Sequence, residues 1–109
     1  MSFSATSQDF WLEDQHILHA LCRDVDDNLQ DSSIDLNTCL GNENGYFRWG
    51  GENFSETASD VELSGSVLIA TMLTEQGEPG ERQNINLNER IANDNGRLVG
   101  KADQSLYTV

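Results

Sequence analysis

The sequence predicts an all-β protein made of two tandem copies of one unit, and three observations support this prediction. The chain repeats itself at a period of 51 residues, since residues 32–49 align without a gap on residues 83–100. Six of the 18 aligned positions are identical, including an Asn-x-Asn-Gly stretch in each copy. Short apolar or β-branched segments recur in both copies, and turn dipeptides separate them.

The strand segments are clearest in the second copy, where they fall at residues 62–63, 67–73, 85–87 and 97–99 and have counterparts in the first. Residues 67–72 are apolar at nearly every position, which predicts a strand buried on both faces. Residues 37–42 and 88–93 have helical spacing over one turn only, which predicts a short 3₁₀ or α turn.

Turn signals join these segments. Asn44-Gly45 and Asn95-Gly96 favour tight turns because both residue types accept positive φ. Residues 64–66, with the sequence Ser-Gly-Ser, fit a tight hairpin. Residues 24–32 and 75–83 are polar, so we expect surface loops there, and the acidic residues 24–27 fit a solvated loop.

The charge of the chain excludes several classes of partner. Asp and Glu number 19 against 6 Lys and Arg, a net charge of −13, and the basic residues are scattered. Nucleic acids and anionic membranes are therefore not expected as partners. The longest apolar run, residues 67–70, is far shorter than the roughly 20 residues that span a bilayer. The first residues show no basic region followed by an apolar one, which predicts a cytoplasmic or non-classically released protein.

The residues that could carry chemistry have plainer interpretations. Cys22 and Cys39 lack C-x-x-C spacing, so we expect reduced thiols. His16 and His19 are expected within one strand, where positions three apart face opposite sides, so no metal pair is expected. Carboxylate pairs around Glu56 arise by chance in so acidic a chain. We therefore expect neither a hydrolase nor a cofactor or metal.

The stretches SSIDLN, ENFSET and INLNERIAN, together with the two Asn-rich turns, resemble the cyanovirin-N homology lectins over about residues 3–99. The start of the chain is similar to the fungal and fern branch of that family. The resemblance implies two pseudo-symmetric halves, each with a three-stranded sheet and a hairpin, that exchange strands into one domain over residues 1–109. The repeats are then residues 1–51 and 52–102, and residues 103–109 form a tail expected to be partly ordered at most.

The resemblance also implies binding of high-mannose glycans, in particular terminal Manα(1-2)Man, without metal or catalysis. The matching residues supply amides, hydroxyls and carboxylates, which can exchange hydrogen bonds with mannose hydroxyls. The implied site comprises Asn42, Asn44, Asn53, Glu56, Thr57, Thr74, Glu75, Gln76 and Glu78. Its loop departs from the family, in which a basic residue commonly lies near Gln76. Taken alone, Asn42 and Asn44 could equally build turns, and Asn53 could cap one.

A weaker second site is implied in the first repeat, at Ser2, Thr6, Asp24, Val25, Asn93 and Asn95. Ala5 stands where the other repeat has Glu56, and Arg23 and Val25 lie where polar sugar contacts are wanted. A lost charge-assisted hydrogen bond is worth about 1.5 to 3 kcal/mol, roughly ten- to a hundred-fold in affinity. The alternative that stays open is a structural or protein-interaction domain with a degenerate sugar pocket.

Two departures from the family bear on stability and assembly. The family ties each repeat with a disulfide, whereas here only Cys22 keeps such a position, opposite Ser7, and Ala58 takes the matching place in the second repeat. Gly50-Gly51 replaces a stiffer, proline-containing hinge, so we expect a flexible junction. We expect a monomer in dilute solution, with strand-exchanged dimers allowed at high concentration.

Overall fold

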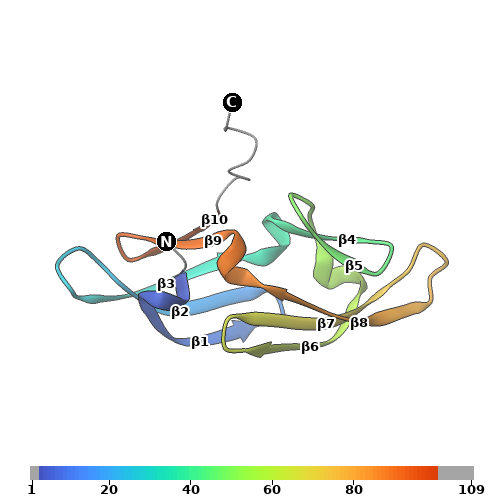
Figure 1. The fold of residues 1–109 in the computed structure, drawn as a ribbon, viewed down its shortest axis with the longest axis horizontal. Coiled ribbons are helices and arrows are strands. Elements are labelled where there is room, and N and C mark those ends of the chain that lie inside the picture. Colours follow the sequence, from blue (N-terminus) through green and yellow to red (C-terminus); the bar gives the residue numbers. More distant parts are fainter. Residues whose placement is uncertain (1–2, 101–109) are drawn as a thin grey trace.

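The computed structural model describes residues 3–100 and shows two three-stranded antiparallel sheets and two hairpins (Figure 1). The first sheet contains β1 (Ser7–Glu13), β2 (Ile17–Arg23) and β3 (Leu29–Asp35), and the second contains β6 (Ala58–Ser64), β7 (Val67–Leu73) and β8 (Pro79–Asn86). The hairpins are β4 (Leu40–Glu43) with β5 (Tyr46–Trp49), and β9 (Ile91–Asp94) with β10 (Arg97–Gly100). The all-β prediction is confirmed.

Short 3₁₀ helices connect these elements, namely η1 (Phe3–Ala5), η2 (Leu36–Thr38), η3 (Phe54–Thr57) and η4 (Leu87–Glu89). The short turns expected near residues 37 and 88 are confirmed as η2 and η4, whereas η1 and η3 have no counterpart in the sequence prediction. Within residues 3–100 no helix has the length and apolar character needed to cross a membrane. Ser2 and the tail at 103–109, for which the sequence made predictions, lie outside the described residues.

Each hairpin packs against the sheet of the other repeat. Hairpin β4–β5 lies beside β8 and η3, and hairpin β9–β10 lies beside β2, β3 and η1 (Figure 1). The backbone N–H of Leu98 on β10 donates to Ser32 Oγ on β3 over 3.0 Å. The exchange of strands that the family resemblance implies is therefore confirmed.

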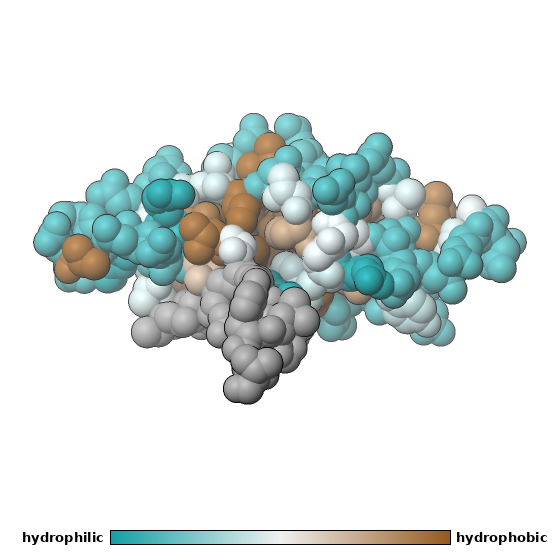
Figure 2. All heavy atoms as spheres, turned by 90° about the horizontal axis from the view of Figure 1, so that it is seen from above, coloured by the Kyte–Doolittle hydropathy of each residue, from teal (hydrophilic) through white to brown (hydrophobic). Residues whose placement is uncertain are grey.

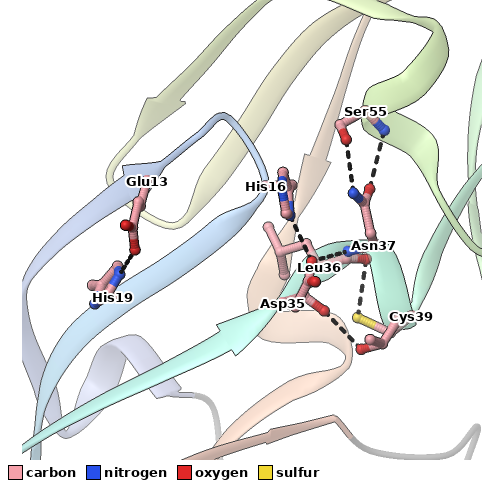
Figure 3. Close-up of polar contacts among 9 residues, drawn as sticks. Glu13, His16, His19, Asp35, Leu36, Asn37, Cys39 and Ser55 are labelled. Atoms are coloured by element: carbon pink, nitrogen blue, oxygen red, sulfur yellow. Dashed lines mark hydrogen bonds and ion pairs between the residues drawn. The ribbon is translucent and has the colours of Figure 1, made fainter.

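Two matched asparagines join the 3₁₀ helices of the two repeats. Asn37 Nδ2 donates to Ser55 Oγ over 2.8 Å, and Asn37 Oδ1 accepts from the Ser55 N–H over 3.1 Å (Figure 3). Asn88 does the same for Ser4, whose N–H donates to Asn88 Oδ1 over 3.0 Å. These side chains fix η2 against η3 and η4 against η1.

The core is a single cluster that draws matching residues from both repeats. Its fully buried pairs are Phe3 and Phe54, Leu18 and Leu68, Cys22 and Met72, Leu36 and Leu87, and Leu40 and Ile91. Seen from above, hydrophilic residues cover most of the two ends of the molecule, and hydrophobic residues gather toward the middle (Figure 2). Because the hairpins are exchanged, each repeat completes the apolar core of the other.

Between β2 and the start of β3, matching residues of the two repeats lie 50 rather than 51 positions apart, because the hairpin turns before β2 and β7 differ in length. The β1–β2 turn has one residue more, at 14–16, than the β6–β7 turn at 65–66. Strand β8 has eight residues where β3 has seven, which restores the period.

Asn44 and Gly45 have φ values of 51° and 90°, and Asn95 and Gly96 have 50° and 89°. Both dipeptides are confirmed as tight turns, with the two positive φ values of type I′.

Two sequence predictions about the sheets are wrong. Loops were expected over residues 24–32 and 75–83, but β3 already begins at Leu29 and β8 at Pro79, so the loops are residues 24–28 and 74–78. The polar ends of these strands are held by backbone ladder bonds, which require no apolar side chains where the sheet is exposed. Strand β7 is fully buried on one face only, at Leu68, Ala70 and Met72, because the alternating residues at 67, 69 and 71 point to the other face and are only partly covered.

The junction between the repeats requires glycine at two positions, for a positive φ at Gly50 and for close backbone packing at Gly51. Gly50 has a φ of 83°, and its N–H donates to the Cys39 carbonyl over 2.9 Å. A Cβ added to Gly51 would lie 2.8 Å from the Cα of Gly41 on β4, closer than such atoms can approach. Gly51 is therefore packed against Gly41, a constraint that the expectation of a merely flexible hinge did not include.

Cys22 lies directly opposite Ser7, as the family resemblance implied, and Ala58, for which the resemblance left Met72 and Leu73 open, lies opposite Met72. Both cysteines are free thiols. Burial, with a smaller contribution from the nearby Asp35 carboxylate, raises the pKa of the Cys39 thiol to about 11.

The Ser7 hydroxyl is buried beside β2 and has no hydrogen-bond partner among the described residues. A buried hydroxyl without a partner lowers the stability of the fold.

We predict that Ser7→Ala increases the free energy of unfolding by about 1 kcal/mol, because it removes a buried polar atom that forms no hydrogen bond. Urea unfolding followed by circular dichroism measures the change. Ser64→Ala, at an exposed position of β6, is the control and should stay within about 0.5 kcal/mol of the parent. A lower stability for Ser7→Ala would contradict the prediction.

Candidate functional site

The site begins with Asn42 on β4, whose side chain ties its hairpin to the second sheet. Asn42 Nδ2 donates to Thr57 Oγ1 and to the Leu73 carbonyl, each over 2.8 Å. Asn42 Oδ1 accepts the Gly45 N–H over 2.7 Å, which closes the β4–β5 turn. These contacts use both polar atoms of the amide, so Asn42 positions the site rather than offering a free group to a ligand.

The turn residue Asn44 holds the loop at residues 74–78. Its Oδ1 accepts the Glu75 N–H over 2.9 Å. The loop is closed by its own backbone, since the Thr74 N–H donates to the Glu78 carbonyl over 2.7 Å and the Gly77 N–H donates to the Thr74 carbonyl over 2.9 Å. The turn of one repeat and the loop of the other are thereby held face to face.

A cavity of about 330 Å³ lies between this turn and this loop. It is lined by Asn42, Asn44, Thr57, Leu73, Thr74, Glu75 and Gly77. Five of these residues belong to the site implied by the family resemblance, namely Asn42, Asn44, Thr57, Thr74 and Glu75. Leu73 and Gly77 were missed, although both lie in or next to the loop that the sequence placed at the rim.

Four residues of the implied site lie outside the lining of the cavity, namely Asn53, Glu56, Gln76 and Glu78. Asn53 precedes η3 with a left-handed φ of 60°, and its side chain forms no capping hydrogen bond there. Glu56 is exposed on η3. Gln76 and Glu78 are exposed in the loop, where the Glu78 carbonyl accepts the Thr74 N–H.

The cavity presents a small set of groups to a ligand. Asn44 Nδ2 and the Glu75 carboxylate have no hydrogen-bond partner within residues 3–100, so they can donate to and accept from hydroxyl groups. The Thr74 hydroxyl makes only a long contact of 3.5 Å with Gln76. Leu73 is 38% exposed and adds an apolar surface. The arrangement suits a neutral, hydroxyl-rich ligand with one apolar face.

The matching residues of the first repeat form the same framework at the opposite end of the molecule (Figure 1). Asn93 Nδ2 donates to Thr6 Oγ1 over 2.9 Å and to the Arg23 carbonyl over 2.8 Å. Asn95 Oδ1 accepts the Val25 N–H over 2.9 Å. Val25 itself is 82% exposed, which leaves its apolar side chain in the position that Glu75 occupies in the second repeat.

Asp24 is fully engaged in holding the loop at residues 24–28. Its Oδ1 accepts the N–H groups of Asp26 and Asn28 over 2.9 and 3.0 Å, and its Oδ2 accepts from Gln30 Nε2 over 2.9 Å. The Asn28 hydrogen bond, followed by that of Gln30, lowers the pKa of Asp24 below its ordinary value of 3.8. Asp24 thus serves the loop, which leaves it less free for a sugar than the sequence implied.

The two histidines face different carboxylates (Figure 3). His16 Nδ1 lies 2.7 Å from Asp35 Oδ1, and His19 Nε2 lies 2.7 Å from Glu13 Oε1. His19 also stacks on Trp11 with ring centroids 4.2 Å apart. His16 lies in the β1–β2 turn and not in a strand, contrary to expectation, because β2 begins one residue later. No group of three potential metal ligands occurs within residues 3–100.

The exchanged hairpins and the polar cavity define the class of protein, a two-repeat β fold with a ligand-sized hollow at a hairpin. The family model described as the CVNH domain matches residues 3–99. The chain is 48% identical to the cyanovirin-N homolog of Tuber borchii over 84 residues, which cover 75% of this chain and 81% of that protein. The chain therefore belongs to the CVNH family, as the resemblance indicated.

Solved structures agree with this assignment. The structure of Tuber borchii CVNH matches with a TM-score of 0.84 and 42% identity, covering 93% of this chain and 100% of that chain. A MoCVNH3 variant in complex with (N-GlcNAc)4 matches with a TM-score of 0.83 and 31% identity, covering 90% and 95%. The microvirin:mannobiose complex matches with a TM-score of 0.79 and 29% identity, covering 91% and 97%. These likenesses support a carbohydrate-binding lectin as the class of protein.

We predict that Asn42→Ala lowers the free energy of unfolding by about 2 to 3 kcal/mol, because the Gly45 N–H and the Leu73 carbonyl lose their partner. Asn93→Ala should cost a similar amount, since Asn93 makes the matching contacts. Urea unfolding provides the measurement. Asn84→Ala, at an exposed position of β8, is the control, and an equal loss in all three variants would contradict a clamping role.

We predict that the Asp24 carboxyl titrates below pH 3.8 in the folded protein. A carboxyl whose folded pKa is lowered stabilises the fold above its unfolded pKa, and this contribution is lost as the pH falls through the folded pKa. Carbon-detected NMR measures the titration, and acid unfolding of Asp24→Asn should lack this part of the pH dependence. An Asp24 midpoint at or above 3.8 would contradict the prediction.

Proposed function

We propose that this protein is a lectin whose cavity beside the β4–β5 turn binds the terminal Manα(1-2)Man unit of high-mannose glycans, without metal and without catalysis. The observation that carries the proposal is the cavity itself, about 330 Å³ between Asn44 and the loop at residues 74–78. Binding pockets for small ligands start at about this size. The partners would be mannose-containing oligosaccharides or glycoproteins.

The lining groups match the chemistry of a neutral sugar. Each mannose hydroxyl both donates and accepts, so it can accept from Asn44 Nδ2 and donate to the Glu75 carboxylate. The exposed part of Leu73 offers an apolar surface to the C–H face of the ring. No Lys or Arg is among the seven lining residues, and one of them is acidic, so anionic sugars are disfavoured.

The framework of the cavity is held before a ligand arrives. The Glu75 N–H, the Gly45 N–H and the Leu73 carbonyl are each bonded to an asparagine of hairpin β4–β5. Little ordering is therefore required on binding, which favours affinity for a small ligand. Two related structures are complexes, one with mannobiose and one with (N-GlcNAc)4, which supports a sugar as the ligand class.

The lining also supports binding rather than hydrolysis. Glycoside hydrolysis uses two carboxyl groups on either side of the scissile bond, about 5 to 9 Å apart. Glu75 is the single carboxylate among the lining residues, and Glu56 lies outside the lining. A bound disaccharide would thus meet one acceptor carboxylate without a second acid opposite it.

We predict that Manα(1-2)Man shifts the NMR amide signals of Asn44, Thr74, Glu75 and Gly77, and that EDTA leaves these shifts unchanged. Glu75→Gln should weaken binding roughly ten-fold or more, because a charge-assisted acceptor is lost. Glu81→Gln on β8, which changes the same charge outside the lining, is the matched control. Unchanged amide signals at millimolar sugar would contradict the proposal and favour the alternative of a structural or protein-interaction domain.

A further inference from the structure

The two ends of the molecule share one backbone framework. The turns Asn44-Gly45 and Asn95-Gly96 have matching positive φ values, and each asparagine accepts an N–H from the facing loop. The loops also match, because the Asp24 N–H donates to the Asn28 carbonyl over 2.8 Å as the Thr74 N–H donates to Glu78 over 2.7 Å. Any difference in ligand binding must therefore come from side chains.

The side chains differ at four of the seven positions that line the cavity of the second repeat, and at two of these four the first repeat carries an ion pair. Arg23 and Asp27 of the first repeat stand where the second repeat has Leu73 and Gly77. Arg23 Nη1 lies 3.0 Å from Asp27 Oδ1 and 3.3 Å from the Asp27 carbonyl. The ion pair thus spans the first-repeat counterpart of the cavity, between the end of β2 and the loop.

We propose, resting on the proposed function, that this ion pair closes the first-repeat end to sugar, so that the protein offers one glycan site rather than two. Leu73 and Gly77 are then the residues that keep the second-repeat cavity open. The family resemblance implies a weak first site because Glu56 has no counterpart there and because Arg23 and Val25 lie where polar sugar contacts are wanted. The structure adds the pairing of Arg23 with Asp27, whereas Glu56 does not line the cavity.

The backbone of the two loops has nearly the same left-handed φ at Asp27 and Gly77. Their φ values are 68° and 78°. Aspartate is among the side chains that tolerate this region, whereas glycine leaves the space above it empty. Exchanging the two residue types therefore changes what fills the space and not the course of the loop.

A second contact covers the same end from the side of β3. A Cβ added to Gly96 would lie 2.8 Å from Gln30 Cγ, so the stem of Gln30 lies directly over this turn. The Gln30 amide is held by Asp24 Oδ2. At the other end Gly80 lies over Gly45, where an added Cβ would lie 3.4 Å from the Gly45 Cα, and glycine brings no side chain to cover it.

The ion pair alone is weak, since the Arg23 and Asp27 side chains are 42% and 81% exposed and an exposed pair is screened by water and salt. Closure does not require a strong pair, however. A sugar entering here must separate Arg23 from Asp27 and displace Gln30, and it meets the apolar Val25 where Glu75 would accept a hydroxyl. A single open site also means that one molecule does not cross-link glycans, because avidity requires at least two sites.

Calorimetry and NMR with Manα(1-2)Man test the inference on the intact chain. The parent protein should bind one equivalent and show shifts at the β4–β5 end only. The triple variant Arg23→Leu, Asp27→Gly, Gln30→Gly should bind a second equivalent about ten-fold or more weakly than the first, because Val25 still lacks the acceptor that Glu75 provides, and new shifts should appear at Val25 and Asn95. A folded triple variant that still binds one equivalent, or a parent that binds two, would overturn the inference.

The reciprocal variant Leu73→Arg, Gly77→Asp keeps the test decisive if the triple variant does not fold. It should lose binding about ten-fold or more while its other amide signals stay at their parental positions. Unchanged affinity would count against closure by an ion pair. A parent protein without any response to dimannoside would instead overturn the proposed function, and the inference would fall with it.

Discussion

Two matched asparagines, one in each repeat, form the hydrogen bonds on which the rest of the structure depends. Asn42 ties hairpin β4–β5 to Thr57 and Leu73, and Asn93 ties hairpin β9–β10 to Thr6 and Arg23. In both cases hairpin and sheet belong to different repeats. A strand-end carbonyl needs a donor when its ladder has ended, and the side-chain amide supplies one across the repeat boundary. The two repeats are therefore interlocked rather than merely adjacent.

This interlocking places the candidate site on the boundary between the repeats. Asn44 comes from the first repeat, and the loop with Thr74 and Glu75 comes from the second. The cavity exists only when the hairpin is docked, so it is a property of the assembled chain and not of either half. Because the docking contacts are hydrogen bonds of fixed direction, they also set the position of the groups that face a ligand.

The repeats diverge most where the chain is exposed, and three of the five fully buried pairs are identical. Core pairs such as Phe3 and Phe54 or Leu36 and Leu87 are unchanged, since a packed interior tolerates little change of volume. At matching surface positions the two repeats use different residues for a side-chain contact. The Ser66 hydroxyl donates to Asn86 Oδ1 over 3.0 Å, whereas the first repeat pairs His16 with Asp35. Exposed loop residues can likewise differ between the repeats, so the cavity beside the β4–β5 turn is open while its first-repeat counterpart is covered.

The sequence by itself determined the repeat and the turns at Asn44-Gly45 and Asn95-Gly96, because the conformation of a tight turn depends on nearby residues. The facing of Ser7 and Cys22 and five of the seven residues around the cavity were implied only by the resemblance to the cyanovirin-N homology family. Only the tertiary structure decided that Asn42 is a clamp, that Glu56 and Asn53 lie outside the lining, and that Arg23, Asp27 and Gln30 cover the first-repeat end. The physical reason is that these roles depend on contacts between segments far apart in the chain, whose distances and directions are set by the exchanged hairpins and not by spacing in sequence.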